Sequence, residues 1–374
     1  MPGIRLGKIL GIRISVDYTW FIVFALFAWS LSAGYFPQHV PGLTRSEYFL
    51  MGAVASLLLF ICVLIHELSH SYVSNLLGLG VSEIMLFIFG GVAKLSREPD
   101  DAKTELKVAI AGPVASLVLA GLFFLLREVL DRVTDAPIIS EVIGFLVFIN
   151  LALLIFNMIP GFPLDGGRVL RALWWMKTGD LKRSTRVASQ IGKGFAAFLI
   201  VMGFFQLASG YFIQGLWGIL IGAFLRSAAD STYKQTLMKT ALQSVKVSDV
   251  MTRNVLTVEE NLPLRHAVEN FFFTHHFVGF PVTSVMGRVV GFLALGDVRA
   301  IPREKWDSTP IKDVMRKLSP ENTVSPQDSA LTVLTRMVND NVGRYIVMEN
   351  NELVGIISRR DIMKTMEFKS ELEG

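Results

Sequence analysis

The chain has 374 residues, enough for two or three domains; 52% of them are hydrophobic and only 18% are charged. An ordinary soluble domain carries about 25% charged residues, so this composition excludes a single soluble core and requires several membrane-spanning helices. The net charge of +4 is too small to indicate nucleic-acid binding, and the single cysteine, Cys62, excludes an internal disulfide.

Six apolar stretches are long enough, or nearly so, to cross a bilayer with a hydrocarbon core of about 30 Å. They are Tyr18–Phe36, Phe49–Leu77, Val108–Leu126, Ile138–Ile159, Phe195–Ser209 and Phe212–Ala228. The fifth is short and only Gly210 and Tyr211 separate it from the sixth, so we expect a tight helical hairpin there. Basic residues precede the first stretch, and the positive-inside rule therefore places the N-terminus in the cytoplasm. Six crossings return the chain to the cytoplasm, which predicts a multi-pass protein of the cell membrane.

The segment Val81–Ser96, between the second and third stretches, is apolar but too short to cross the bilayer twice. We interpret it as a re-entrant or membrane-surface β-hairpin interrupted by two glycines. A helix that ends in a loop packed on the bundle is equally compatible with such a short apolar run. The exposed edge of a hairpin can pair with an extended peptide, and the candidate pairing residues are Phe89, Gly90, Gly91 and Val92.

The second apolar stretch contains His66-Glu67-Leu68-Ser69-His70, which is the zinc-peptidase pattern HExxH. Residues four apart share one helix face, so His66 and His70 can present both imidazoles to one metal ion. Glu67 lies beside them and can take a proton from the attacking water. Ionisable side chains at membrane depth are costly and therefore indicate function. These three residues predict an intramembrane metalloprotease.

A catalytic zinc ion takes three protein ligands and keeps a fourth position open. The best candidate for the third ligand is Asp165, within the sequence NMIPGFPLDGGR at Asn157–Arg168. Pro160 and Pro163 end the preceding helix, and the two glycines after Asp165 allow a sharp turn, so the carboxylate can bend back toward the metal. The predicted topology brings both motifs near the cytoplasmic face.

Together the two motifs resemble the site-2 protease family of intramembrane zinc metalloproteases, over the whole six-span region. The resemblance implies His66, His70 and Asp165 as the ligands of one Zn²⁺ per chain. It also implies Glu67 as the general base, and Asn157 as a residue that holds the substrate carbonyl or stabilises the oxyanion. The implied substrate is a transmembrane or membrane-proximal segment of another protein. For Asn157 an interhelical hydrogen bond is the alternative role.

Two further features near these motifs are interpreted as packing. Ala111-Gly112-Pro113, on the third stretch, also resembles a family feature, and we read it as a close helix contact or kink. Cys62 precedes His66 by one helical turn, and a fourth protein ligand would close the metal site against water.

A repeat begins where the composition becomes soluble. Asp249-Val250-Met251 recurs 64 residues later as Asp313-Val314-Met315, and Val290-Gly291 recurs as Val354-Gly355. This pattern resembles a tandem pair of cystathionine-β-synthase (CBS) domains. We therefore expect a polytopic α-helical membrane protein followed by an α/β tandem CBS module, with a six-span domain at residues 1–228, a linker at 229–244, and CBS domains at 245–304 and 305–374.

The second copy carries a sequence that resembles the adenine-nucleotide signature of CBS domains, GIISRRD from Gly355 to Asp361. By this resemblance Asp361 accepts hydrogen bonds from both ribose hydroxyls of ATP, ADP or AMP, and Ser358 contacts phosphate. The first copy retains Asp297 but has Ala294 in place of the serine, which weakens the case for a second nucleotide. The alternative role of both aspartates is to cap a helix. The CBS domains are also the candidate site of homo-oligomer formation.

Two other classes of protein compete with the protease. One is a membrane transporter or channel gated by CBS domains, which would need ionisable residues along several spans rather than one cluster. The other is a catalytically inactive scaffold, and the intact Glu67 argues against it because a scaffold needs no general base.

Overall fold

The computed structural model describes residues 3–88, 90–95, 97–243 and 245–373, and its contacts divide the chain into two compact units, Met1–Lys234 and Gln235–Gly374. Six helices in the described residues are long and apolar enough to cross a membrane: Tyr18–His39, Arg45–Leu76, Ala102–Val133, Pro137–Asn157, Leu181–Ala208 and Phe212–Leu242. The prediction of a polytopic helical protein followed by a mixed α/β module is confirmed.

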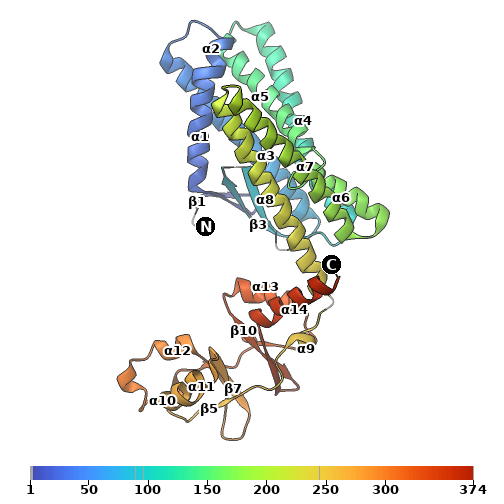
Figure 1. Cartoon of the computed structure of the whole chain (residues 1–374). Coiled ribbons are helices and arrows are strands. Elements are labelled where there is room, and N and C mark those ends of the chain that lie inside the picture. Colours follow the sequence, from blue (N-terminus) through green and yellow to red (C-terminus); the bar gives the residue numbers. More distant parts are fainter. Residues whose placement is uncertain (1–2, 89, 96, 244, 374) are drawn as a thin grey trace. The chain divides into compact units, whose positions relative to one another are not determined.

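The first unit is a bundle of helices with a small sheet at the end that also holds α6 (Figure 1). Its helices, the last of which continues into the second unit, are α1 (Tyr18–Ser30), α2 (Phe36–His39), α3 (Arg45–Leu76), α4 (Ala102–Val133), α5 (Pro137–Asn157), α6 (Asp165–Thr178), α7 (Leu181–Ala208) and α8 (Phe212–Gln243). Polar residues set several helix starts. Thr44 and Glu47 form a capping box at α3, and Asp101 accepts a hydrogen bond from the Thr104 backbone N–H at α4.

The last two long helices extend well beyond their apolar stretches. α7 begins at Leu181 rather than Phe195, because its first turns are polar and Asp180 caps them. α8 continues as a helix to Gln243, through most of the segment that we expected to be a linker. Hydropathy marks only the lipid-compatible part of a helix, so it underestimates both. The expected tight turn between them is present, with Gly210 at a φ of 87°.

A four-stranded sheet in the order β1-β2-β3-β4 packs against the helices of the first unit. Its strands are β1 (Ile4–Ile9), β2 (Ile12–Val16), β3 (Val81–Phe87) and β4 (Gly90–Leu95). The predicted hairpin is therefore confirmed as β3 and β4, with β4 last in the sheet order; Phe89 lies outside the described residues. The sequence did not predict β1 and β2. Their place depends on the parallel pairing of β2 with β3, a long-range contact without a local signal.

The buried face of the sheet lies against α3. Ile14 and Ile84, both almost fully buried, belong to an apolar cluster that includes Leu64 and Leu68 of α3. Since Leu64 and Leu68 flank His66 on the same helix, this packing fixes the sheet beside the HExxH motif.

The second unit contains two sheets, in the orders β5-β6-β7-β8 and β11-β10-β9. The first copy contributes β5 (Val258–Glu259), α10 (Leu264–Ala267), α11 (Phe273–His275), β6 (Gly279–Thr283), β7 (Val289–Ala294) and α12 (Leu295–Arg299). The second contributes β9 (Thr323–Val324), α13 (Ala330–Asn339), β10 (Arg344–Glu349), β11 (Glu352–Ser358) and α14 (Arg359–Glu373).

The two copies exchange their leading segments. β8 (Arg316–Lys317) leads into the second copy but pairs with β7 of the first. Thr252 leads into the first copy but pairs with Ile356 of the second. The leading segment of each repeat therefore pairs with the sheet of the other, as a strand in one case and as a single bridge in the other, which joins the two copies into one module.

Candidate metal centre

The imidazoles of His66 and His70 project from one face of α3 and are almost fully buried. The neighbouring helix α4 fixes the orientation of both rings. Nδ1 of His66 lies 2.9 Å from Oγ of Ser116, and Nδ1 of His70 lies 2.7 Å from the carbonyl oxygen of Val108. A carbonyl oxygen can only accept, so Nδ1 of His70 must carry the proton. A neutral His70 therefore presents the lone pair of Nε2 to the space between the helices.

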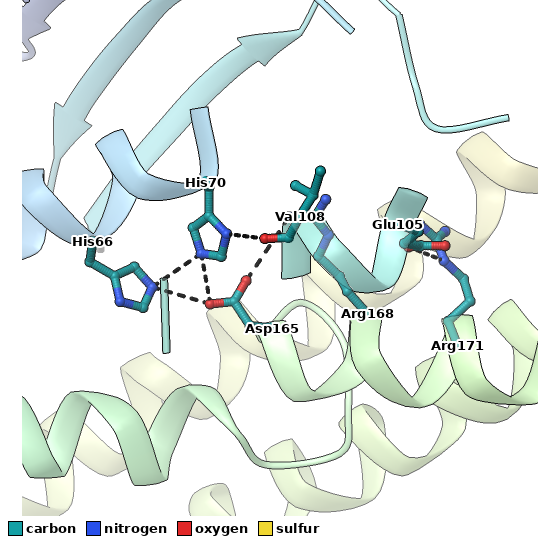
Figure 2. Close-up of polar contacts among 7 residues, drawn as sticks. All are labelled: His66, His70, Glu105, Val108, Asp165, Arg168 and Arg171. Atoms are coloured by element: carbon teal, nitrogen blue, oxygen red, sulfur yellow. Dashed lines mark hydrogen bonds and ion pairs between the residues drawn. The ribbon is translucent and has the colours of Figure 1, made fainter. Parts of the chain in front are cut away.

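Asp165, the first residue of α6, meets the two rings at this point (Figure 2). Its Oδ2 lies 3.1 Å from Nε2 of His66 and 3.0 Å from Nε2 of His70. The two Nε2 atoms are 3.3 Å apart. Within the described part of the chain, these three residues form the group whose ligand atoms converge as a metal site requires.

The loop before α6 folds closely under the helix and brings Asp165 back toward α3. A Cβ atom added to Gly166 would overlap the carbonyl groups of Met158 and Ile159, so this approach needs glycine. Asp165 stands in the first turn of α6, where the helix dipole stabilises a negative charge. The turn predicted from the Pro and Gly pattern is therefore the feature that directs the carboxylate inward.

Positive charge also surrounds Asp165. Nη1 of Arg168 lies 4.0 Å from the second carboxylate oxygen, Oδ1. Burial disfavours the charged form, but the imidazoles and Arg168 outweigh it and hold the pKa of the Asp165 carboxyl well below its ordinary range. The carboxylate is thus ionised at neutral pH, as a metal ligand must be.

Gly112 of α4 lies directly against the imidazoles. A Cβ atom at this position would be 2.5 Å from Nε2 of His66 and would overlap Nε2 of His70 as well. The close contact expected for Ala111-Gly112-Pro113 is therefore a contact with the two histidines. It keeps open the space into which both Nε2 atoms point.

Glu67 lies between the imidazole pair and the edge of the sheet. A Cβ atom on Gly91 of β4 would be 2.9 Å from Cδ of Glu67 and 3.3 Å from its Oε1. The strand thus passes next to the carboxylate, and only glycine leaves room for it. This contact joins two predicted features, the general base and the candidate pairing strand.

Two family models match this chain. The model described as Peptidase family M50 matches residues 54–133 and 128–202, and the model described as CBS domain matches residues 247–304 and 311–367. Zinc metalloprotease MJ0392 of Methanocaldococcus jannaschii is 32% identical over 374 residues, which cover 99% of this chain and 98% of that protein. Rip3 of Mycobacterium tuberculosis is 31% identical over 365 residues, which cover 97% of this chain and 93% of Rip3. The chain belongs to peptidase family M50.

This M50 chain is a multi-pass membrane protein with tandem CBS domains, and it belongs to the site-2 protease branch of zinc metalloproteases. Among solved structures it is similar to the site-2 protease from Methanocaldococcus jannaschii. The TM-score is 0.42 and the identity 29%, over 62% of this chain and 95% of that chain.

The three converging atoms of the M50 chain fit the zinc ion that the family implies. Zinc bonds of about 2.0–2.1 Å in a tetrahedron separate neighbouring ligand atoms by about 3.3 Å. The three atom pairs of His66, His70 and Asp165 are 3.0, 3.1 and 3.3 Å apart. Two imidazoles and one carboxylate, with Nδ1 atoms already engaged, are a donor set that zinc accepts.

The other predicted residues of the M50 chain have different surroundings. Asn157 is the last residue of α5 and is half-buried, and its role in catalysis stays a prediction. In the CBS module, Oδ2 of Asp361 accepts hydrogen bonds from the backbone N–H of Ser358 at 2.9 Å and from its Oγ at 2.6 Å. Asp297 accepts from the backbone N–H of Ala294 at 3.1 Å. Both aspartates therefore make the helix-capping contacts that were the alternative to nucleotide binding.

Three contacts made by the predicted site residues were not predicted from the sequence. Ser116 and Val108 orient the imidazoles, and a serine or a backbone carbonyl on another helix has no recognisable pattern. Arg316 donates two hydrogen bonds to Oδ1 of Asp297, at 3.0 Å from Nε and 2.8 Å from Nη2. The exchange of leading segments brings Arg316 to that carboxylate, and the repeat alone does not reveal the exchange.

Proposed function

We propose that the protein is an intramembrane endopeptidase that cuts peptide bonds in or next to the transmembrane segments of other proteins. The metal would be held by His66, His70 and Asp165. The observation that supports this most directly is the convergence of two Nε2 atoms and one carboxylate oxygen within hydrogen-bonding distance. In the absence of a cation or a proton these electron-rich atoms would repel each other.

The chain supplies the proton transfers. His66, His70 and Asp165 would hold the zinc ion, which would supply Lewis acidity to the scissile carbonyl and to the attacking water. Glu67 would take the proton of the attacking water and return it to the leaving amine. Asn157 would orient the substrate carbonyl or stabilise the developing oxyanion. The proximity of Gly91 to Glu67 supports a scissile bond held close to β4.

Substrate would bind along the edge of β4. A transmembrane helix hides its carbonyl groups in internal hydrogen bonds and must unwind before attack. Gly90, Gly91 and Val92, with Phe89 before them, would replace the lost hydrogen bonds by pairing with the extended segment. β4 is last in its sheet, which supports this role.

We infer further that the N-terminus and the CBS domains are cytoplasmic, following the basic residues before the first span. The CBS pair would bind an adenine nucleotide at Asp361 and Ser358 and modulate cleavage, and it could also join two chains. The CBS-gated transporter remains the alternative. The clustering of the ionisable ligands at one site favours the protease.

The deciding experiment compares wild type with Glu67→Gln, as full-length protein in membranes. Proteins that accumulate uncut in the Glu67→Gln membranes, identified by proteomics, provide the substrate for a purified assay. We expect the cleavage rate to fall by about 10²–10⁴-fold, because general acid–base catalysis is lost. Zinc content should stay at wild-type level, since Glu67 is not a ligand.

The matched control is Glu128→Gln, which removes an exposed carboxylate that pairs with Arg132 on α4. It should cut at the wild-type rate. Cleavage by Glu67→Gln at the wild-type rate would contradict the proposed mechanism.

A further inference from the structure

A buried ion pair lies beside the three candidate metal ligands, His66, His70 and Asp165, and has no part in the proposed chemistry. Glu105 of α4 is 1% exposed, and its Oε1 accepts a hydrogen bond from Nε of Arg171 at 2.7 Å. Nη2 of Arg171, on α6, contacts the same oxygen. The Glu105 side chain is 1% exposed and that of Arg171 17%, so close mutual contact is needed to compensate for the water that the buried carboxylate has lost. Such a pair is held in one geometry.

Glu105 is on α4, which contacts both histidines, and Arg171 is on α6, which begins with Asp165 (Figure 2). Glu105 stands one helical turn before Val108, whose carbonyl accepts the proton of His70 Nδ1. Arg171 stands six residues after Asp165 on the same helix. The ion pair therefore joins the helix that orients the histidines to the helix that carries the third ligand.

Arg171 also contacts the loop on the other side of Asp165. Its guanidinium lies 4.9 Å from the ring centre of Phe162, which is almost fully buried. Asp165 is thus held from both directions, by the loop before it and by the helix after it. A small displacement of α6 would change the distances to both imidazoles, and displacements of about 1 Å are enough to disturb a site of this kind.

We propose that Glu105 and Arg171 are positioning residues that fix α6 against α4, so that Asp165 reaches both histidines at the spacing of a metal site. This inference rests on the proposed zinc site. The pair acts through the position of Asp165 and touches neither the metal nor the substrate. Its loss should lower zinc affinity although every ligand is retained.

The test uses full-length protein in detergent with Glu105→Gln, Arg171→Gln and Arg171→Lys. Zinc affinity is measured by competition with a chromophoric chelator, and the ligand geometry by the visible spectrum of the Co²⁺-loaded protein. Supporting groups outside the ligand set typically change metal affinity by about 10–100-fold, so we expect losses in that range for the two glutamine variants. Arg171→Lys keeps the charge but not the paired donors, and should lie between them and wild type.

Two further variants separate positioning from simple stability. The charge swap Glu105→Arg with Arg171→Glu should recover part of the zinc affinity and of the cobalt spectrum. Glu128→Gln breaks an exposed ion pair on the same helix α4 and should change neither.

The outcomes distinguish the inference from the function on which it rests. If wild type binds one zinc ion and the glutamine variants lose thermal stability without any loss of zinc affinity, the pair is only structural and the inference is wrong. If wild type itself fails to bind one zinc ion per chain, the proposed function fails instead. Should the glutamine variants not fold, Arg171→Lys decides, and wild-type affinity in that variant would overturn the proposal.

Discussion

Asp165 in the membrane unit and Asp297 in the CBS module are equally buried carboxylates with opposite surroundings. The side chain of Asp165 is 12% exposed and that of Asp297 16%. Asp297 meets N–H donors, from the Ala294 backbone and from Arg316, so both of its oxygens have partners. Asp165 meets two imidazole nitrogens whose rings already use their other nitrogen elsewhere. Burial alone therefore does not mark a site; Asp165 is distinguished by its partners, the Nε2 atoms of two imidazoles, which can also bind a metal ion.

The corresponding aspartate of the second CBS copy, Asp361, has fewer hydrogen-bond partners than Asp297 in the described part of the chain. Asp361 accepts from Ser358 through Oδ2 alone in the contacts that the structure describes, whereas Arg316 also engages Oδ1 of Asp297. If a ribose bound at these positions, it would have to displace the hydrogen-bonded guanidinium of Arg316 from Asp297, whereas no such hydrogen bond to Asp361 is found among the described residues. The two copies of one repeat thus differ in how available their aspartates are.

The largest expected effect is at Gly112, where the space between the imidazoles is kept open. Gly112→Ala places a methyl group on both Nε2 atoms, so we expect zinc to be lost from the purified protein, as measured by elemental analysis. Gly121→Ala is the matched control on α4, because a Cβ atom there meets nothing within 4 Å. Equal zinc content in the two variants would show that the cluster is not a metal site of the described geometry.

A smaller effect is expected at Ser116, which contacts Nδ1 of His66. Ser116→Ala leaves that nitrogen without its partner and should weaken zinc binding by about 10–100-fold, measured by chelator competition. Ser69→Ala is the control, since within the described residues the Ser69 hydroxyl donates to the Ile65 carbonyl of its own helix, at 2.8 Å. A Ser116→Ala protein with unchanged affinity would mean that packing alone orients His66.

The smallest effect distinguishes the two CBS aspartates. Asp361→Asn should weaken ATP binding by about tenfold or more, because a charge-assisted contact to the ribose is lost, whereas Asp297→Asn should change it little. Titration calorimetry of the full-length protein measures both. Equal losses of ATP affinity in the two variants would contradict the predicted difference between the two aspartates. If titration of wild type with ATP gives no heat of binding, nucleotide binding is not part of the function.

The features of this protein that can be predicted from its sequence are those that depend on local sequence patterns. Hydropathy located the six crossings, helical spacing paired His66 with His70, and the Pro and Gly residues around Asp165 indicated that it turns back. The parts that were missed are contacts between distant segments. β2 against β3, Ser116 against His66, and Glu105 against Arg171 each join residues whose individual sequences are unremarkable. The same limit applies to Arg316, whose position follows from the exchange between the repeats.

The edge of β4 has a consequence for inhibition. Unpaired backbone groups along Gly90–Leu95 form a template for any extended chain. If substrate pairs with β4 as proposed, a short peptide that follows this edge would compete with substrate without carrying a zinc-chelating group. N-methylation of every second amide in such a peptide, on the side that faces β4, would abolish the competition and leave its side chains unchanged.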